Sequence, residues 1–203
     1  MTDHTEKARR TPPAKCRTCN RPMNSPLLCD SCRTLYPAEG LNHFELFGLT
    51  PTFDLDMADL RRRYLHLSRD AHPDHRSTTD DADVSLQVSA QLNEAHRVLT
   101  DPVLRAEYLL ELCGGQSSAQ DKSVTPDVLN ETFLLREEIA EAQAAGDAAA
   151  LEDCRRRAEQ KRAAAVEQIA ILARQLPADE PLRRELRAAL NATKYYTKLL
   201  GEA

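Results

Sequence analysis

The sequence predicts an all-α protein, and three observations support this fold class. Ala, Leu, Arg and Glu dominate the 203 residues, whereas aromatic residues make up only 4% and glycine occurs only 6 times. This mixture favours helices over strands. Apolar residues recur at helical spacing, and Pro or Gly pairs separate the periodic segments. Outside a short cysteine-containing stretch, no segment shows the two-residue alternation of a strand.

Composition and charge argue against several classes of function. Apolar residues make up 41% and charged residues 29%, as in ordinary globular proteins. No apolar run approaches the roughly 20 residues that span a bilayer, and no secretory signal is recognisable, so we expect no membrane partner. The net charge of −5 argues against broad nucleic-acid binding, which needs a basic field.

The N-terminal segment, residues 1–15, is polar and charged and carries a Pro pair, so we expect a disordered tail. Residues 16–36 follow as a cysteine module. Its four clustered cysteines form two C-x2-C pairs: Cys16, Cys19, Cys29 and Cys32. Four thiolates at this spacing match a tetrahedral structural zinc site that holds a single ion. Since so short a segment cannot bury a core, the metal must supply its folding energy.

Other interpretations of the cysteine module stay open at this stage. Without a secretory signal a reducing compartment is expected, which disfavours disulfides. An iron–sulfur cluster and a redox dithiol pair are alternatives to zinc. A nucleic-acid-binding zinc ribbon is another, because Arg17, Arg21 and Arg33 are present, although no aromatic residues interleave with them. A closed four-cysteine site leaves no open position for catalysis, so we predict a structural or docking role.

A linker at residues 37–41 leads to the first predicted helix, a short apolar one at residues 43–49. Asp56 can cap a second helix. The apolar residues of that second helix fall on one stripe: Leu60, Tyr64, Leu67 and Ala71. Pro73 follows two residues later and terminates the helix.

The next segment, residues 76–83, is predicted to be a polar loop. A third helix then places its apolar residues on one face: Val84, Val88, Leu92, Ala95 and Leu99. Pro102 occupies the first position of a fourth helix, which the pair Gly114-Gly115 terminates. We therefore predict one helical domain over residues 42–113.

Beyond a Gly- and Ser-containing linker at residues 114–124, three more helices are predicted. Thr125-Pro126 opens the first, and Gly146-Asp147 separates it from the second. A stretch with two prolines, residues 177–181, separates the second from the third. Because short connections between helices imply antiparallel packing, residues 125–201 are predicted to form a three-helix bundle.

The tripeptide His72-Pro73-Asp74 is the most informative motif, because it presents an imidazole and a carboxylate at the tip of a helical hairpin. The preceding helix carries three consecutive arginines: Arg61, Arg62 and Arg63. A basic helix beside a rigid turn suits docking to an acidic partner. Taken alone, the tripeptide favours an ordinary turn, because Pro and Asp are common turn residues, and the arginines favour a solvated helix face. A catalytic dyad is disfavoured, because no nucleophile or third orienting group accompanies the pair.

The helical order, the basic helix and the tripeptide together resemble a J-domain, the module that stimulates ATP hydrolysis by DnaK-type chaperones. The sequence Arg-Ala-Glu-Tyr-Leu-Leu at residues 105–110 resembles the HscB family, the J-protein co-chaperones of iron–sulfur cluster assembly. The resemblance covers roughly residues 42–200, and the cysteine module resembles the extension of eukaryotic and some bacterial members. It implies an L-shaped molecule with a J-domain helical hairpin, a C-terminal three-helix bundle and a small zinc-binding module.

The resemblance also implies roles for the residues of the turn. His72, Pro73 and Asp74 would contact the chaperone ATPase and promote hydrolysis. The arginines at positions 61, 62 and 63 would supply electrostatic docking. Physical chemistry is consistent with these roles, because Pro73 fixes the loop and Asp74 offers a carboxylate for a charge-assisted hydrogen bond.

The helix predicted at residues 125–145 has more apolar surface than a three-helix bundle buries. At 100° per residue, its core stripe consists of Val128, Leu135, Ile139 and Ala142. Leu129 and Phe133 lie roughly 100° and 140° away from Val128 on the same helical wheel, off that stripe. An exposed apolar patch indicates a protein-binding site. Packing of these two residues against the J-domain or a neighbouring helix is the alternative.

The resemblance favours the binding interpretation, because HscB proteins bind the cluster scaffold IscU through this face. Aligned through Leu135-Arg-Glu-Glu138, the matching positions are Leu129, Asn130, Phe133, Leu134 and Glu137, together with Tyr195 of the last helix. Asn130 departs from the family, where an apolar residue is usual.

The sequence therefore predicts a co-chaperone that stimulates the ATPase of a DnaK- or HscA-type chaperone and delivers IscU to it, without being an enzyme itself. The alternatives are a J-protein with another client and a zinc-module adaptor that binds nucleic acid. We expect a bacterial cytoplasmic location, or the mitochondrial matrix in a eukaryote. The sequence does not decide the chaperone paralogue, the role of the zinc module or the oligomeric state, and either the module or the apolar patch could mediate a homodimer.

Overall fold

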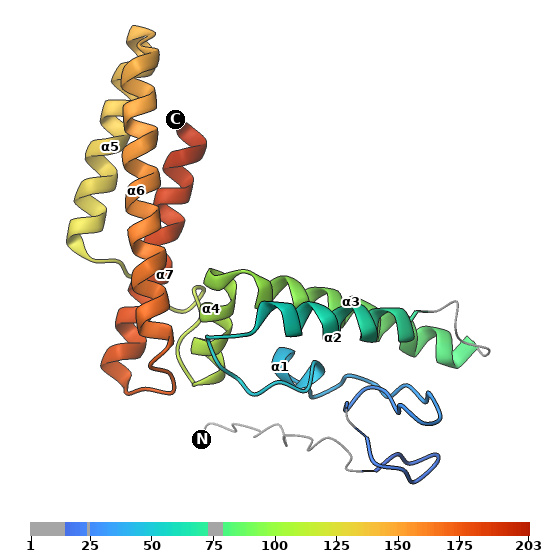
Figure 1. Cartoon of the computed structure of the whole chain (residues 1–203). Coiled ribbons are helices and arrows are strands. Elements are labelled where there is room, and N and C mark those ends of the chain that lie inside the picture. Colours follow the sequence, from blue (N-terminus) through green and yellow to red (C-terminus); the bar gives the residue numbers. More distant parts are fainter. Residues whose placement is uncertain (1–14, 24, 73–78) are drawn as a thin grey trace. The chain divides into compact units, whose positions relative to one another are not determined.

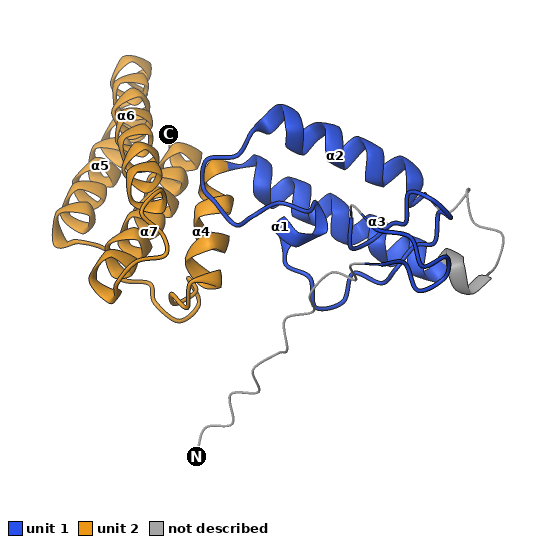
Figure 2. Cartoon of the chain, turned by 60° about the horizontal axis from the view of Figure 1, so that its bottom comes forward, with its two compact units in different colours: residues 1–101 blue, residues 102–203 orange. Residues whose placement is uncertain are grey.

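The computed structural model of the chain describes residues 15–23, 25–72 and 79–203. The predicted disordered tail lies almost wholly outside the described residues, and so do Pro73 and Asp74 of the tripeptide. By its internal contacts the chain divides into two compact units, residues 1–101 and residues 102–203, which Figure 2 shows in different colours.

Seven helices and no strands occur among the described residues, which confirms the all-α prediction. The first unit contains α1 (His43–Leu46), α2 (Met57–Asp70) and α3 (Thr79–Thr100), and the second contains α4 (Pro102–Leu112), α5 (Pro126–Ala145), α6 (Ala148–Ala173) and α7 (Glu180–Glu202) (Figure 1). No helix within the described ranges combines the length and the apolar character that crossing a bilayer requires.

The first unit combines the cysteine module with three helices. α1 is shorter than predicted and is held by a capping box, in which the Asn42 side chain accepts from the backbone N–H of Phe44 and Glu45 while Glu45 accepts from the Asn42 N–H. α2 begins at the predicted cap, Asp56. α1 and α2 both pack on α3. Their buried side chains include Phe44, Phe47, Leu60, Leu67, Val88, Leu92, Ala95 and Leu99.

The start of α3 corrects one prediction. The segment at residues 76–83 was expected to be a polar loop, but α3 already begins at Thr79. A polar composition does not by itself distinguish a loop from the first turn of a helix, because both accommodate polar residues. Periodicity therefore located the apolar part of α3 correctly and its beginning too late.

The second unit contains the predicted bundle of α5, α6 and α7, which pack against one another. Gly146 ends α5 in a left-handed conformation (φ 67°), and the Asp147 side chain then caps α6. The core cluster consists of Leu135, Ile139, Cys154, Ala158, Ala192, Tyr196 and Leu199. The fourth helix, α4, packs against α6 and α7 within this unit.

The segment between α4 and α5 is tied to α7. Arg187, with 1% of its side chain exposed, donates to the carboxylate of Glu107 at 2.9 Å and to the carbonyl of Gln116 at 2.8 Å. The amide of Asn191 donates to the carbonyls of Asp121 and Ser123. Burial alone raises the pKa of Glu107, but Arg187 and a neighbouring lysine outweigh burial and hold that pKa below its usual value. The predicted linker therefore follows α7 closely.

Candidate functional site

The exposed face of α2 carries the predicted docking arginines. Arg62 pairs with Asp59 one turn earlier, and Arg63 Nε lies 2.7 Å from the second oxygen of the same carboxylate. Arg61 and Arg62 project into solvent, and 73% of the Arg62 side chain is accessible. Burial lowers the pKa of His96 on α3, and the Arg61 charge lowers it further. This part of α2 therefore presents cationic charge to an approaching partner.

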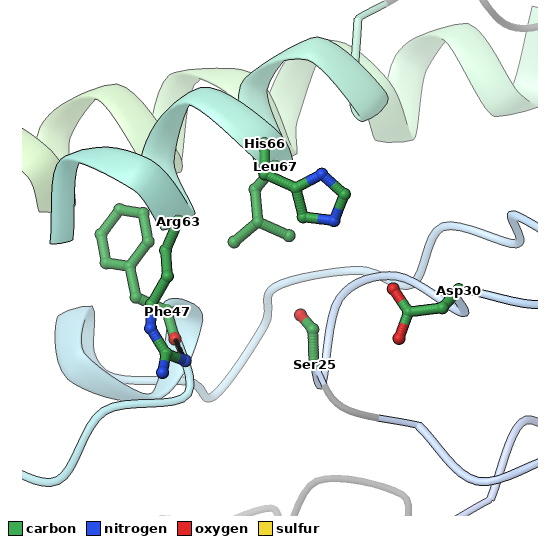
Figure 3. Close-up of a pocket in the computed structure, with 6 residues that line it drawn as sticks. All are labelled: Ser25, Asp30, Phe47, Arg63, His66 and Leu67. Carbon is green, nitrogen blue, oxygen red and sulfur yellow. Dashed lines mark hydrogen bonds between the residues drawn. The ribbon is translucent and has the colours of Figure 1, made fainter. Parts of the chain in front are cut away.

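Arg63 is held differently from its two neighbours. Its Nη1 donates to the carbonyl oxygen of Phe47 at 3.0 Å, which ties α2 to the residue that follows α1 (Figure 3). It also borders a cavity of about 240 Å³ between α2 and the cysteine module, lined by Ser25, Asp30, Phe47, Arg63, His66 and Leu67. Arg63 thus contributes to the packing of the first unit, whereas Arg61 and Arg62 face outward.

His72 is exposed directly after α2, and the backbone before it is fixed by α3. Ala71 is only 2% exposed, and its carbonyl oxygen accepts hydrogen bonds from the hydroxyl groups of Ser85 and Ser89. Ser85 itself is fully buried. A buried carbonyl that accepts two hydrogen bonds cannot reorient without losing both of them. The contacts with α3 therefore fix the peptide group between Ala71 and His72.

Asp70, the last residue of α2, is a buried carboxylate with 5% of its side chain exposed. Arg33 of the cysteine module pairs with it. His66 Nδ1 lies 3.1 Å and Arg69 Nε 3.6 Å from its oxygens. Burying a carboxylate is unfavourable unless cationic or hydrogen-bonding groups compensate it. The cysteine module therefore contacts the end of α2, two residues before His72.

The four cysteines of the module lie together as their spacing predicts. All four Sγ atoms are within 4.8 Å of one another, with Cys16 and Cys32 at 3.4 Å and Cys19 and Cys29 at 3.6 Å. A tetrahedral site with metal–sulfur bonds of about 2.3 Å requires sulfur–sulfur distances of roughly 3.8 Å. All four are free thiols. The donor set and its geometry fit one four-coordinate metal ion.

Hydrogen bonds to the sulfur atoms prepare the cysteines for metal binding. The hydroxyl oxygen of Tyr36 lies 3.1 Å from Cys16 Sγ, and that of Thr34 lies 3.1 Å from Cys32 Sγ. The backbone N–H of Cys19 donates to Cys16 Sγ at 3.4 Å. The Tyr36 hydrogen bond is the largest of several causes that lower the pKa of Cys16 to about 5. Because the thiolate is the form that binds metals, these contacts favour the ligand state of Cys16. A backbone hydrogen bond at Arg21 lowers the pKa of Cys19, but burial and hydrogen bonds with the other three thiols outweigh it and raise that pKa to about 12.

The outer face of α5 is apolar and exposed. Leu129 is 46%, Phe133 58% and Leu134 51% exposed, whereas Leu135 of the core stripe is 1% exposed. The predicted rotation of Leu129 and Phe133 away from the core is confirmed, and packing of these two side chains inside the bundle is wrong. Leu134, which the helical wheel did not single out, extends the apolar surface. The two polar residues predicted for this face are also exposed: Asn130 and Glu137.

Tyr195 on α7 is partly exposed and borders a pocket of about 300 Å³. The remaining lining residues are Ser118, Lys122, Asn191 and Lys194. Its neighbour Tyr196 is buried and donates its hydroxyl to Glu131 at 2.7 Å, and burial with this contact raises the pKa of Tyr196. The two adjacent tyrosines therefore have different environments, and only Tyr195 is available to a partner.

Sequence reasoning missed the contact between Arg33 and Asp70. One signal was present, because a carboxylate at the C-terminal end of a helix opposes the helix dipole and needs a cationic neighbour. Nothing in the spacing indicated which cation would supply it, since several arginines lie closer to Asp70 in the sequence than Arg33 does.

Two family models match the chain. A model described as the DnaJ domain matches residues 42–108, and a model described as the HSCB C-terminal oligomerisation domain matches residues 124–203. The two matches fall on the predicted helical domain and on the predicted bundle, respectively.

Curated relatives carry related descriptions. The co-chaperone protein HscB homolog of Vibrio vulnificus is 42% identical over 115 residues, which cover 53% of this chain and 65% of the relative. The iron–sulfur cluster co-chaperone protein HscB homolog of Arabidopsis thaliana is 31% identical over 138 residues, covering 66% of this chain and 54% of the relative. These matches thus span somewhat less than two thirds of the relatives' own lengths.

Two solved structures share the fold. The chaperone HscB from Vibrio cholerae is 30% identical, with a TM-score of 0.64 over 80% of this chain and 94% of that protein. Human co-chaperone protein HscB superposes with a TM-score of 0.73 over 91% of this chain and 93% of that protein, at 24% identity.

Proposed function

Because this chain belongs to the HscB family of J-domain co-chaperones, we propose that it stimulates the ATPase of a DnaK- or HscA-type chaperone and delivers to it the IscU-type scaffold of iron–sulfur cluster assembly. In this function the chain promotes ATP hydrolysis by the chaperone and is not an enzyme itself. The observation that carries the proposal is the combination of an exposed His72 beside a cationic α2 with a separate exposed apolar face on α5.

The α2 surface is the chaperone-contacting site of this proposal. Arg61 and Arg62 accelerate encounter with an acidic surface through long-range attraction. His72, with Pro73 and Asp74 after it, then contacts the ATPase and promotes hydrolysis. The support from geometry is that Arg61, Arg62 and His72 are exposed on one helix and its end, while the Ala71 carbonyl just before His72 is held by Ser85 of α3.

The α5 surface is the scaffold-contacting site. Leu129, Phe133 and Leu134 offer apolar area to a partner, and Glu137 lies one turn beyond Phe133 on the same side. Tyr195 adds a partly exposed aromatic side chain from α7. Asn130 occupies a position that is apolar in the family, so this chain uses a smaller apolar surface at that point.

Steady-state ATPase measurements test both sites together. The rate of a cognate DnaK- or HscA-type chaperone is measured with this protein, with IscU, and with both. We expect the two proteins to stimulate synergistically, and we expect His72→Gln to abolish stimulation while leaving the melting temperature nearly unchanged, because the residue is exposed.

Each other outcome of that measurement has a definite meaning. Stimulation without synergy would support the J-protein activity but refute IscU as the client, so that another client would have to be sought. No stimulation of any cognate chaperone would refute the proposal and make the tripeptide an ordinary turn. Full stimulation by a folded His72→Gln variant would refute the role of the turn.

We further propose that the cysteine module holds one structural zinc ion through Cys16, Cys19, Cys29 and Cys32. Zinc favours a closed tetrahedral set of thiolates and supplies folding energy without redox chemistry. Elemental analysis of the purified chain should find one zinc per molecule. A stoichiometric amount of iron with visible absorption would instead support an iron–sulfur or iron–thiolate site.

The proposed location is the bacterial cytoplasm, or the mitochondrial matrix if the source is eukaryotic. Both compartments are reducing, as free thiols in a metal site require. Fractionation with detection of the endogenous protein tests the location directly.

A further inference from the structure

The contact between the cysteine module and α2 suggests a role for the module. The second cysteine pair closes a tight turn in which the Arg33 N–H donates to the Cys29 carbonyl at 2.8 Å and the Cys29 N–H donates to the Thr34 carbonyl at 3.0 Å. The turn places Arg33 in a left-handed conformation, with φ 62°. Asn20 takes the same conformation (φ 58°) in the first pair.

Arginine is an unusual residue for the left-handed backbone conformation at position 33. A left-handed conformation is favoured by Gly and Asn and is unfavourable for most other residues, so Asn20 fits its position and Arg33 does not. Arg33 compensates through its side chain, which reaches Asp70 at the end of α2. The turn with the second cysteine pair thus places the Arg33 guanidinium against the buried Asp70 carboxylate.

Asp70 in turn needs this cation. It is 5% exposed and lies at the C-terminal end of α2, where the helix dipole opposes negative charge. Two further cationic neighbours, Arg69 and His66, are weaker substitutes, because Arg69 is 71% exposed at 3.6 Å and His66 is charged only when protonated. A cavity of about 240 Å³ lies between α2 and the module and is bordered by His66 (Figure 3).

Two anchors therefore hold adjacent residues immediately before His72. α3 holds the Ala71 carbonyl through Ser85, and the cysteine module holds the Asp70 carboxylate through Arg33. We infer that Arg33 is a positioning residue, through which the metal-binding module fixes the end of α2 and so presents His72 to the chaperone. The inference rests on the proposed co-chaperone function and assigns the module a part in it.

Arg33→Ala tests the inference with two independent readouts. Hydrogen exchange of a peptide covering the last turn of α2 and His72 should be about fivefold faster, because one anchor of that turn is lost. Maximal stimulation of the chaperone ATPase should fall about fivefold, while the concentration for half-maximal stimulation changes less than about twofold, because Arg61 and Arg62 still direct the encounter. Arg33→Lys should restore part of both effects, since a point charge replaces the guanidinium.

Arg21→Ala is the matched control. Arg21 is an exposed arginine of the same module and forms no ion pair with α2 among the described residues, so its loss should change neither readout. Removing the metal with a chelator should accelerate exchange at the end of α2 as Arg33→Ala does, because the turn that carries Arg33 depends on the metal site.

A double variant separates positioning from plain stability. In Arg33→Ala/Asp70→Asn no uncompensated carboxylate remains, so the melting temperature should recover while maximal stimulation stays low. Recovery of stimulation together with stability would overturn the inference, and so would unchanged exchange, or faster exchange with full stimulation, in Arg33→Ala. A wild-type chain that stimulates no chaperone would overturn the proposed function and the positioning role with it, whereas the exchange data would still decide whether Arg33 orders the end of α2.

Discussion

The exposed faces of α2 and α5 are built on opposite principles. On α2 the exposed arginines supply charge, and the end of the helix is anchored on both sides, by Ser85 of α3 at the Ala71 carbonyl and by Arg33 of the cysteine module at the Asp70 carboxylate. On α5 the exposed face is dominated by apolar residues, and the helix is held by the packing of its core face and by polar contacts with its neighbours, such as those of Glu131 with Lys161 and Tyr196. Hydrogen bonds and ion pairs with a partner require side chains in a fixed orientation. Apolar contacts depend instead on the area and the shape of the surface.

This difference explains why the two faces respond to different perturbations. Attraction between charges acts at long range and is screened by salt, so the α2 face should govern encounter and be sensitive to ionic strength. Apolar contact acts at short range, so the α5 face should govern how long a partner remains bound. The comparison would fail if substitutions on α2 changed mainly the dissociation rate, or if substitutions on α5 changed mainly the salt-dependent association rate.

The largest expected effect distinguishes two residues of α5. Leu135→Ala should lower the free energy of unfolding by about 3 kcal/mol, because it empties a buried core position. Phe133→Ala should leave stability nearly unchanged, because Phe133 is 58% exposed, but should weaken scaffold binding at least about tenfold. Thermal melts and calorimetric titration with the scaffold measure the two quantities.

Ile171→Ala is the control for that prediction, because Ile171 is a 47% exposed apolar residue on a different helix of the same bundle. It should change neither stability nor scaffold affinity appreciably. Unchanged affinity in Phe133→Ala, or an equal loss in Ile171→Ala, would show that α5 carries no specific scaffold site.

The success of the sequence in locating the α5 face has a physical reason. α5 is an uninterrupted helix from its Thr125 cap to Gly146, so a rotation of 100° per residue stays in register over its whole length. The cysteines were predictable for a similar reason, because each C-x2-C pair is a local turn. The exposure of Arg61 and Arg62 was predictable, because arginine side chains are seldom buried, whereas the half-buried position of Arg63 was not.

What the sequence could not provide are contacts between distant segments. The pairing of Arg33 with Asp70 depends on how the module packs on α2, and no local rule encodes it. The packing of α4 on α6 and α7 is of the same kind. Leu134 was predicted on the exposed face only through the resemblance, although its angle of roughly 120° from Val128 already places it about as far from the core stripe as Leu129.

A smaller effect is expected from the outward-facing arginines. The double variant Arg61→Glu/Arg62→Glu should reduce chaperone affinity about fivefold at low ionic strength, and the difference should shrink as salt is added. The melting temperature should change little, because both side chains are exposed. Binding measured across a salt series checks this prediction, and a loss that is independent of salt would contradict an electrostatic role. Scaffold affinity, measured in parallel, should stay at the wild-type value.

The smallest effect should come from Arg63, and it should be of a different kind. Arg63→Ala removes the hydrogen bond to the Phe47 carbonyl and one contact with Asp59, so we expect a loss of about 1 kcal/mol in the free energy of unfolding. Chaperone affinity should fall less than in Arg62→Ala, because Arg63 is turned toward α1 and the pocket in Figure 3. Urea melts and chaperone titrations of the two single variants give the comparison. If Arg63→Ala weakens docking more than Arg62→Ala without lowering stability, the docking surface of α2 extends over the cavity beside the cysteine module.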